Sequence, residues 1–275
     1  MPRPSLLAGS FFTVTKLLPT LRPTLWRFWY DSLASKDRAG ELLFMNYGYD
    51  ADEHSLPLLP ADEPFRYSIQ LYAHVTKGIN IAAKDVLEIG CGRGGGGSFI
   101  VRYHHPNSYT GVDLSETAIA WCQSKLNLPA TQWIHGRADS LPMPNNSVDL
   151  VINVESSHTY PSMPLFLREV QRVLRPGGYF AFCDVRMAEQ IPELEQQFAE
   201  SGLDRINLHF ITRNVLRALD GITAVREQQI LTKVPRLFRA AFRDFAGIKD
   251  SILHRMMAAD KLQYVSCLLQ KPADT

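Results

Sequence analysis

The stretch VLEIGCGRGG, residues 86–95, is the part of this sequence that decides its fold. It opens as an apolar run, interrupted by Glu88 and ended by glycine, and this pattern is typical of a buried parallel strand. Glycines directly after a strand carry no Cβ atom, so the backbone can turn tightly and approach a ligand closely. The helix expected next offers its N-terminal N–H groups to a negatively charged group. The stretch therefore predicts a strand, a ligand-binding turn and a helix.

Strands and helices alternate after this stretch. Five short strands are predicted, at residues 85–89, 109–113, 131–135, 148–154 and 179–184. Three helices are predicted between them, at residues 98–103, 115–126 and 165–174. Repeated β-α-β steps of this length imply a Rossmann-like α/β fold, in which helices cover both faces of a parallel sheet.

The pattern changes after Asp184. Helices are predicted over 189–200 and 233–245, with a less regular stretch between them. Residues 261–270 alternate between apolar and polar, which predicts a late antiparallel strand at the edge of the sheet. Basic residues recur at helical spacing against aromatic ones from Lys233 to Phe245, which indicates either a solvated helix face or a lid over an apolar acceptor.

The first 84 residues follow another pattern, in which prolines break up long regular elements. Helices are predicted only over 24–36 and 64–77. We therefore expect an N-terminal leader with cap helices over 1–84. A Rossmann-like domain should follow over 85–275, with a lid segment at about 187–258.

Composition narrows the function classes. A net charge of +1 gives no reason to expect nucleic acid as a partner. The four cysteines lie far apart without metal-ligand spacing, so we expect no metal and reduced thiols in a cytoplasmic protein. No apolar run approaches the roughly 20 residues that span a bilayer. The basic, aromatic segment 1–30 leaves two alternatives, a packed cap or peripheral contact with a membrane surface or lipid-like substrate.

Two carboxylates bear on the identity of the ligand. Gly90, Gly92 and Gly95 also match GxGxxG, a pattern of NAD-binding proteins. Glu88, however, stands where a carboxylate would repel a pyrophosphate and attract a cation, such as the ammonium and sulfonium of S-adenosylmethionine (SAM). Asp113 ends the second strand, where a carboxylate accepts hydrogen bonds from ribose hydroxyls in both kinds of site.

Further along the chain the sequence resembles a family. The strings GVDLS (111–115), LP (141–142), SVDLV (147–151) and LRPGG (174–178) follow residues 86–92 in the order of class I SAM-dependent methyltransferase motifs. Several local strings also resemble the phthiotriol/phenolphthiotriol dimycocerosate and fatty-acid O-methyltransferases: NYGY (46–49), GGGGS (94–98), NVESSH (153–158) and RDFAG (243–247).

This resemblance implies a seven-strand sheet with SAM across the carboxyl ends of strands one, two and four. The residues expected to contact SAM are Tyr49, Glu88, Gly90, Cys91, Gly92, Gly94, Asp113, Leu114, Ala138, Asp139 and Asn153. One position departs from the family pattern, because Arg137 stands where an aspartate usually accepts from adenine. An arginine has no acceptor, so Ala138 and Asp139 are expected to serve instead.

The resemblance also suggests the reaction, transfer of a methyl group from SAM to a hydroxyl or carboxyl of a lipid-like or polyketide-like small molecule. His158 follows strand four, and an imidazole can remove the proton of an alcohol near neutral pH. Its alternative is a structural or substrate-orienting role. Glu155 is a candidate to orient His158 or bind substrate, with a structural hydrogen-bonding role as its alternative. C-methylation, and a SAM-fold protein that binds ligand without methyl transfer, remain the alternative functions.

Overall fold

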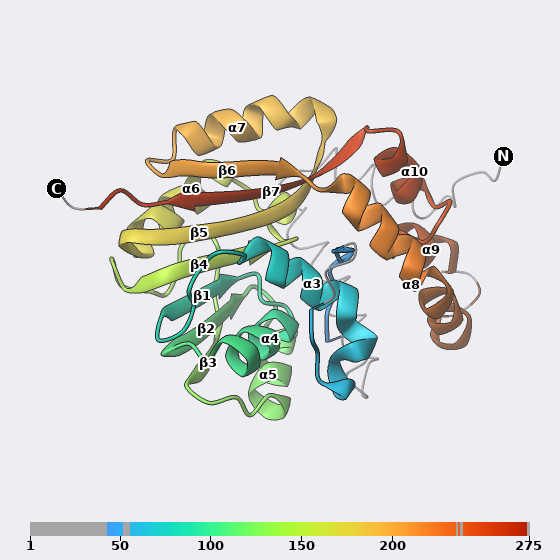
Figure 1. The fold of residues 1–275 in the computed structure, drawn as a ribbon, viewed down its shortest axis with the longest axis horizontal. Coiled ribbons are helices and arrows are strands. Elements are labelled where there is room, and N and C mark those ends of the chain that lie inside the picture. The colour runs from blue at the N-terminus through green and yellow to red at the C-terminus, as the bar shows by residue number, and fades with distance from the viewer. Residues whose placement is uncertain (1–42, 52–55, 235, 237–238, 274–275) are drawn as a thin grey trace.

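The computed structural model describes residues 43–51, 56–234, 236 and 239–273. Its centre is a seven-stranded sheet in the order β3-β2-β1-β4-β5-β7-β6 (Figure 1). The strands are β1 (Asp85–Ile89), β2 (Ser108–Asp113), β3 (Thr131–His135), β4 (Val148–Val154), β5 (Leu174–Met187), β6 (Asp204–Phe210) and β7 (Leu262–Gln270). The first five pair in parallel, whereas β7 runs antiparallel to both β5 and β6. The predicted Rossmann-like α/β fold, with seven strands, is confirmed.

Helices cover both faces and one end of this sheet. The α-helices are α3 (Arg66–Val75), α4 (Gly95–His104), α5 (Glu116–Lys125), α6 (Met163–Val173), α7 (Ile191–Ala199), α8 (Thr212–Lys233), α9 (Arg239–Phe245) and α10 (Ile252–Ala258). Short 3-10 helices are η2 (Pro60–Phe65), η3 (Ser157–Thr159) and η4 (Ala188–Gln190). Figure 1 shows α8, α9 and α10 gathered at one end of the sheet, and α7 along the β6 edge.

Successive strand residues point to opposite faces, which divides the core into two layers. Val86 packs in the layer that contains α3 and α4, whereas Leu87 packs in the layer that contains α6 and α7. The same alternation places the next residue of β1, Glu88, on the face of Val86. A carboxylate on this strand therefore points into the core beneath α3 and α4.

Several local predictions are confirmed. Ser115 caps α5, because its hydroxyl accepts the backbone N–H of Ala118 at 3.1 Å. The helix predicted over 64–77 is present as η2 followed by α3. The helix predicted over 24–36 lies outside the described residues.

The region after Glu200 differs from the prediction. The stretch expected to be irregular contains strand β6 and the long helix α8. The single helix expected over 233–245 is wrong, because α8 ends at Lys233 and α9 begins at Arg239. Strand β7 is antiparallel as predicted but is not the edge, because β6 lies outside it. The sequence of β6 does carry a strand pattern, because Ile206, Leu208 and Phe210 alternate with polar residues, and the prediction missed it.

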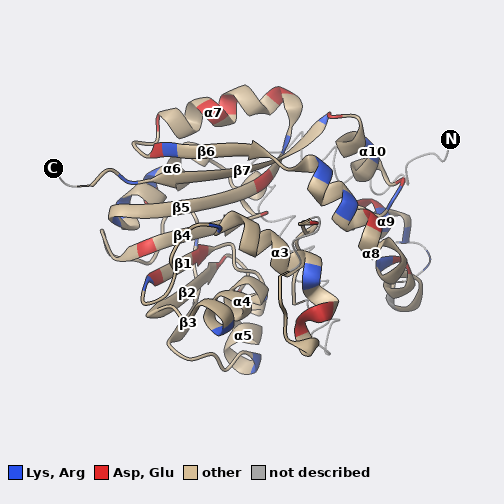
Figure 2. Ribbon diagram, in the orientation of Figure 1, with Lys and Arg blue, Asp and Glu red and all other residues tan. Residues whose placement is uncertain are grey.

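The helices carry both acidic and basic residues, with uncharged residues between them (Figure 2). Figure 2 shows acidic residues on α7 and several basic residues on α8, interspersed with uncharged ones. Within the described part of the chain, no helix is both long and apolar enough to cross a membrane.

Candidate active site

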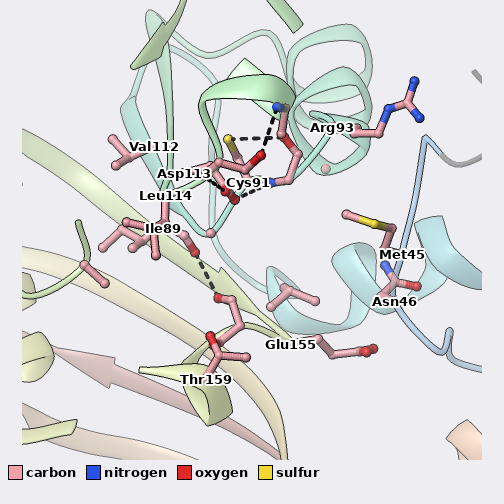
Figure 3. Close-up of a pocket in the computed structure, with 18 of the residues that line it drawn as sticks. Met45, Asn46, Ile89, Cys91, Arg93, Val112, Asp113, Leu114, Glu155 and Thr159 are labelled. Carbon is pink, nitrogen blue, oxygen red and sulfur yellow. Dashed lines mark hydrogen bonds between the residues drawn. The ribbon is translucent and has the colours of Figure 1, made fainter. Parts of the chain in front are cut away.

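A pocket opens at the carboxyl ends of β1, β2 and β4. Residues that follow these strands line it, together with the segment 43–46 and the loop after β3. Figure 3 shows Met45 and Asn46 on one side of the pocket and Cys91, Asp113 and Leu114 on the other. Glu155 and Thr159 reach it from the segment after β4. Eight of the predicted site residues line this pocket: Gly90, Cys91, Gly92, Asp113, Leu114, Ala138, Asp139 and Glu155.

The glycines of the turn after β1 differ in what lies next to them, the pocket or the core. Gly90, Gly92 and Gly94 all have positive φ, at 77°, 52° and 74°. A Cβ on Gly92 would meet only the methyl group of Met45, at 3.1 Å, so its open side faces the pocket. A Cβ on Gly94 would stand 2.6 Å from the Trp133 ring. Gly94 therefore serves close packing of the turn on the core and does not line the pocket.

The turn itself orients the carboxylate of Asp113. One oxygen accepts the N–H of Gly92 at 2.8 Å, and the other accepts the N–H of Ser115 at 2.8 Å. A carboxylate has about four acceptor sites, so a group of this kind can also accept from a ligand with paired hydroxyls. Ribose presents such a pair, and Asp113 on the pocket wall fits it.

The departure at Arg137 has a structural consequence. The Arg137 guanidinium forms a bidentate pair with Asp139, at 2.9 and 2.7 Å. Hydrogen bonding to Arg137 lowers the pKa of Asp139. Both side chains line the pocket next to Ala138, so the acceptor capacity of Asp139 toward a ligand is shared with Arg137.

Glu88 lies away from the pocket wall. Its side chain is buried, and its two oxygens accept hydrogen bonds from Tyr72, at 2.6 Å, and from Tyr109. Burial raises the pKa of Glu88 to about 7, although both phenols oppose the shift. The predicted direct contact between Glu88 and a ligand ammonium is not possible in this arrangement. Side chains of β1 alternate between the two faces of the sheet, and this alternation directs Glu88 into the core.

Two other residues that were predicted to contact SAM, Asn153 and Tyr49, also do not line the pocket. Asn153 is fully buried and donates to the Ile89 carbonyl at 2.8 Å and to the Ser156 hydroxyl at 2.8 Å, so it braces the turn after β4. The ring of Tyr49 stacks on His74, with centroids 4.3 Å apart. Tyr49 therefore packs within the cap and does not line the pocket.

Glu155 joins the pocket to the segment that covers it. Its carboxylate accepts the backbone N–H of Tyr47 at 2.7 Å, while the carbonyl of the same peptide unit, that of Asn46, accepts from Arg226 at 3.0 Å. Burial raises the pKa of Glu155 to about 8, opposed by Tyr264 and the Tyr47 N–H. Its φ of 49° is a strained value for a non-glycine residue, which is often found at functional sites.

His158 lies in η3, directly after β4, and is held by the end of β5. Its Nδ1 lies 2.8 Å from an Asp184 oxygen, so Asp184, and not Glu155, orients the imidazole. Burial of Asp184 opposes ionisation, but the charges of His158 and Arg186 lower its pKa below the ordinary value. The His158 side chain is 19% exposed whereas Asp184 is fully buried, so the pair combines a fixed carboxylate with an accessible ring.

Three residues near the pocket were not among the predicted site residues: Asp184, Arg186 and Tyr72. Asp184 ends a predicted strand that neighbours strand four, and that adjacency was the available signal. Arg186 contacts Asp184 at 3.1 Å and donates to Ser157 at 2.6 Å. Tyr72 comes from the cap helix α3, and no motif connects it with the glycine turn.

The pocket can accommodate SAM. It combines an open backbone at Gly92, a pre-oriented carboxylate at Asp113 and the N-terminus of α4, which is the donor and acceptor set of an adenosyl amino acid.

Comparisons with known proteins agree with this fold. A family model described as a methyltransferase domain matches residues 87–182. The solved structure of geranyl diphosphate C-methyltransferase from Streptomyces coelicolor A3(2), in complex with Mg²⁺, geranyl diphosphate and S-adenosyl-L-homocysteine, superposes with a TM-score of 0.63 at 16% identity, over 88% of this chain and 98% of that one. The chain is thus a class I methyltransferase that uses SAM.

Two curated relatives define the family more narrowly. Phthiotriol/phenolphthiotriol dimycocerosates methyltransferase of Mycobacterium leprae (strain TN) is 39% identical over 241 residues, which cover 87% of this chain and 89% of the relative. Fatty-acid O-methyltransferase of Mycolicibacterium smegmatis (strain ATCC 700084 / mc(2)155) is 40% identical over 235 residues, 85% of each chain. The chain belongs to the family of these methyltransferases, as its sequence motifs predicted.

Proposed function

We propose that this enzyme methylates an oxygen, in a hydroxyl or carboxyl group, of an apolar lipid-like molecule, with SAM bound in the pocket at the ends of β1, β2 and β4. The observation that carries the proposal is the His158–Asp184 pair beside that pocket, because an alcohol acceptor must lose a proton. The names of the two relatives, which act on dimycocerosate lipids and fatty acids, support the acceptor class.

Bound SAM would supply a methyl group made electrophilic by the sulfonium. Asp113 would hold the ribose hydroxyls, and the open backbone at Gly92 would let the turn approach the ligand closely. Ala138 and Asp139 would lie at the adenine. The chain's main contribution is then alignment of the acceptor oxygen in a pocket from which water is excluded.

His158 would take the acceptor proton at Nε2. Asp184 fixes Nδ1 as the donor of their hydrogen bond, which leaves the other ring nitrogen as the base. Ser157 and Arg186 hold Asp184 in turn, at 2.6 and 3.1 Å. A carboxylic acid acceptor is already ionised near neutral pH and would need His158 only for orientation.

The covering segments would form the acceptor side. Of the proposed lid at 187–258, α7 packs in the core and β6 belongs to the sheet, so we confine the lid to α8, α9 and α10. Arg226 of α8 donates both to Ala246, at 2.7 Å, and to Asn46, so it ties the lid to the segment over the pocket. We retain the basic N-terminal segment as a candidate for contact with a lipid or membrane surface.

The test is transfer of labelled methyl from SAM to a panel of acceptors: a long-chain secondary alcohol, a long-chain fatty acid, and short-chain versions of each. We expect labelled ether or ester from a long-chain acceptor and far less from the short ones. Labelled product with a new carbon–methyl bond would instead establish C-methylation. Tight SAM binding without transfer to any member would contradict the proposal.

A further inference from the structure

Tyr72 stands between the buried Glu88 and the pocket. Its side chain lines the pocket and is only 6% exposed, and its hydroxyl lies 2.6 Å from a Glu88 oxygen. A Cβ on Gly96, which also lines the pocket, would stand 2.2 Å from the Tyr72 ring and 2.6 Å from its oxygen. The phenol end is therefore packed directly against the first turn of α4, where no side chain could intervene.

The partner of this hydroxyl determines what else it can bind. A phenol has one hydrogen to donate and lone pairs with which to accept. Glu88 is a carboxyl in the core that takes the hydrogen of Tyr72 on one oxygen and that of Tyr109 on the other. Because the hydrogen of Tyr72 is committed, its oxygen can only accept from a ligand. An acceptor oriented by a carboxylate attracts a cationic donor most strongly.

The position of Tyr72 in the pocket indicates whether it would lie near the adenosine or near the methionine end of SAM. Asp113 ends β2 and the Arg137–Asp139 pair follows β3, so the adenosine side of the pocket lies toward β3. Tyr72 packs edge-on against Phe44, with centroids 6.1 Å apart, in the segment that forms the opposite wall. In Figure 3 the neighbours of Phe44, Met45 and Asn46, face Asp113 across the pocket.

Asn46 adds a second acceptor at this end. It lines the pocket and is 6% exposed, and its side-chain oxygen is buried with no hydrogen-bond partner among the residues that the structure describes. A buried acceptor without a partner costs free energy, which a donor on a ligand would recover. The N-terminus of α4, beside Gly96, offers N–H donors in turn. This end thus presents acceptors for an ammonium and donors for a carboxylate, the two charges of an amino acid.

We propose that Tyr72 is the residue that accepts a hydrogen bond from the methionine ammonium of SAM, and that Glu88 acts only through Tyr72 as a positioning residue. The inference rests on the placement of SAM in this pocket under the proposed function. It reassigns the cation-binding role that was expected of Glu88 to a residue of the cap.

The experiment compares the affinities of S-adenosylhomocysteine and of its deamino analogue, in which hydrogen replaces the amine, by titration calorimetry. The wild type should prefer the amine-bearing ligand. Tyr72→Phe should lower that preference about tenfold or more, because a charge-assisted hydrogen bond is lost, while affinity for the deamino analogue stays the same. Glu88→Gln should lower the preference to a smaller extent, because an amide no longer fixes the phenol hydrogen.

Tyr109→Phe is the matched control. It removes the other phenol from Glu88, but Tyr109 does not line the pocket, so the preference should remain while thermal stability falls. An unchanged preference in folded Tyr72→Phe, or its loss in Glu155→Gln instead, would overturn the proposal. Failure of the cofactor placement is distinguishable, because Asp113→Asn would then leave the affinity for both ligands unaltered.

Discussion

Asp184 contacts His158 through both of its carboxylate oxygens. One oxygen lies 2.8 Å from Nδ1 of the ring, and the other accepts the backbone N–H of His158 at 2.8 Å. The ends of β4 and β5, adjacent in the sheet, bring the two residues together. This relationship fixes both the position of the ring and the nitrogen that faces Asp184.

His158→Ala separates catalysis from positioning. With an alcohol acceptor, we expect kcat to fall by ~10²–10⁴ with SAM affinity nearly unchanged, because the general base is lost. The wild-type rate should rise with pH through an inflection that the variant lacks. Full activity with the same pH profile in the variant would show that His158 is structural.

Asp184→Asn tests the orientation of the ring. The amide can donate to Nδ1, which would place the ring hydrogen on the nitrogen that should act as base. We expect a loss of kcat close to that of His158→Ala, with little change in the acceptor KM. Ser157→Ala removes one hydrogen bond from Asp184 but leaves the His158 contact, and should retain most activity. Equal activities of both variants would refute the orientation role.

Asp113→Ala should weaken SAM binding by ~1.5–3 kcal/mol, because two ribose hydroxyls lose a charged acceptor. The structure adds a second effect, since Asp113 also accepts the N–H groups of Gly92 and Ser115. Calorimetric titration should be paired with a melting curve, in which the midpoint also decreases. A folded variant with unchanged affinity would place SAM elsewhere.

Two glycines of the turn should respond differently to a side chain. In Gly92→Ala the added methyl faces the pocket, so SAM affinity should fall sharply, with roughly 1–2 kcal/mol lost in stability from the positive φ. In Gly94→Ala the methyl meets the Trp133 ring, so stability should fall further than in Gly92→Ala. Titration and chemical denaturation of both variants check this; the reverse order of the stability losses would contradict it.

The two buried glutamates should make stability depend on pH. Folding raises the pKa of Glu88 to about 7 and that of Glu155 to about 8, from an ordinary 4.5, so the folded chain keeps protons that the unfolded chain has released. Stability should therefore fall as pH rises from about 4.5 toward 8. Melting temperatures measured over this range should fall less steeply in Glu155→Gln, whereas the exposed Glu189→Gln should follow the wild type. Identical slopes in all three proteins would contradict the assignment.

Most of the sheet, the glycine turn and the place of Asp113 were predictable from local patterns: short apolar runs, glycine after a strand, and a carboxylate at a strand end. The family motifs likewise lie within short strings. Strand β6 carries the same period of two at Ile206, Leu208 and Phe210, but its edge position, which leaves Ile206 and Phe210 exposed, follows only from the pairing with β7.

The surroundings of the carboxylates depend on contacts between distant parts of the chain, which local sequence patterns do not reveal. Glu88 and Asp184 lie near the carboxyl ends of β1 and β5, and Glu155 directly follows β4, so their sequence positions look equivalent. The pleat directs Glu88 into the core against Tyr72, the left-handed backbone turns Glu155 toward Tyr47, and the β4–β5 pairing brings Asp184 to His158. Partners far apart in sequence set the charge, hydrogen bonding and exposure of each carboxylate, and chain folding alone brings those partners together.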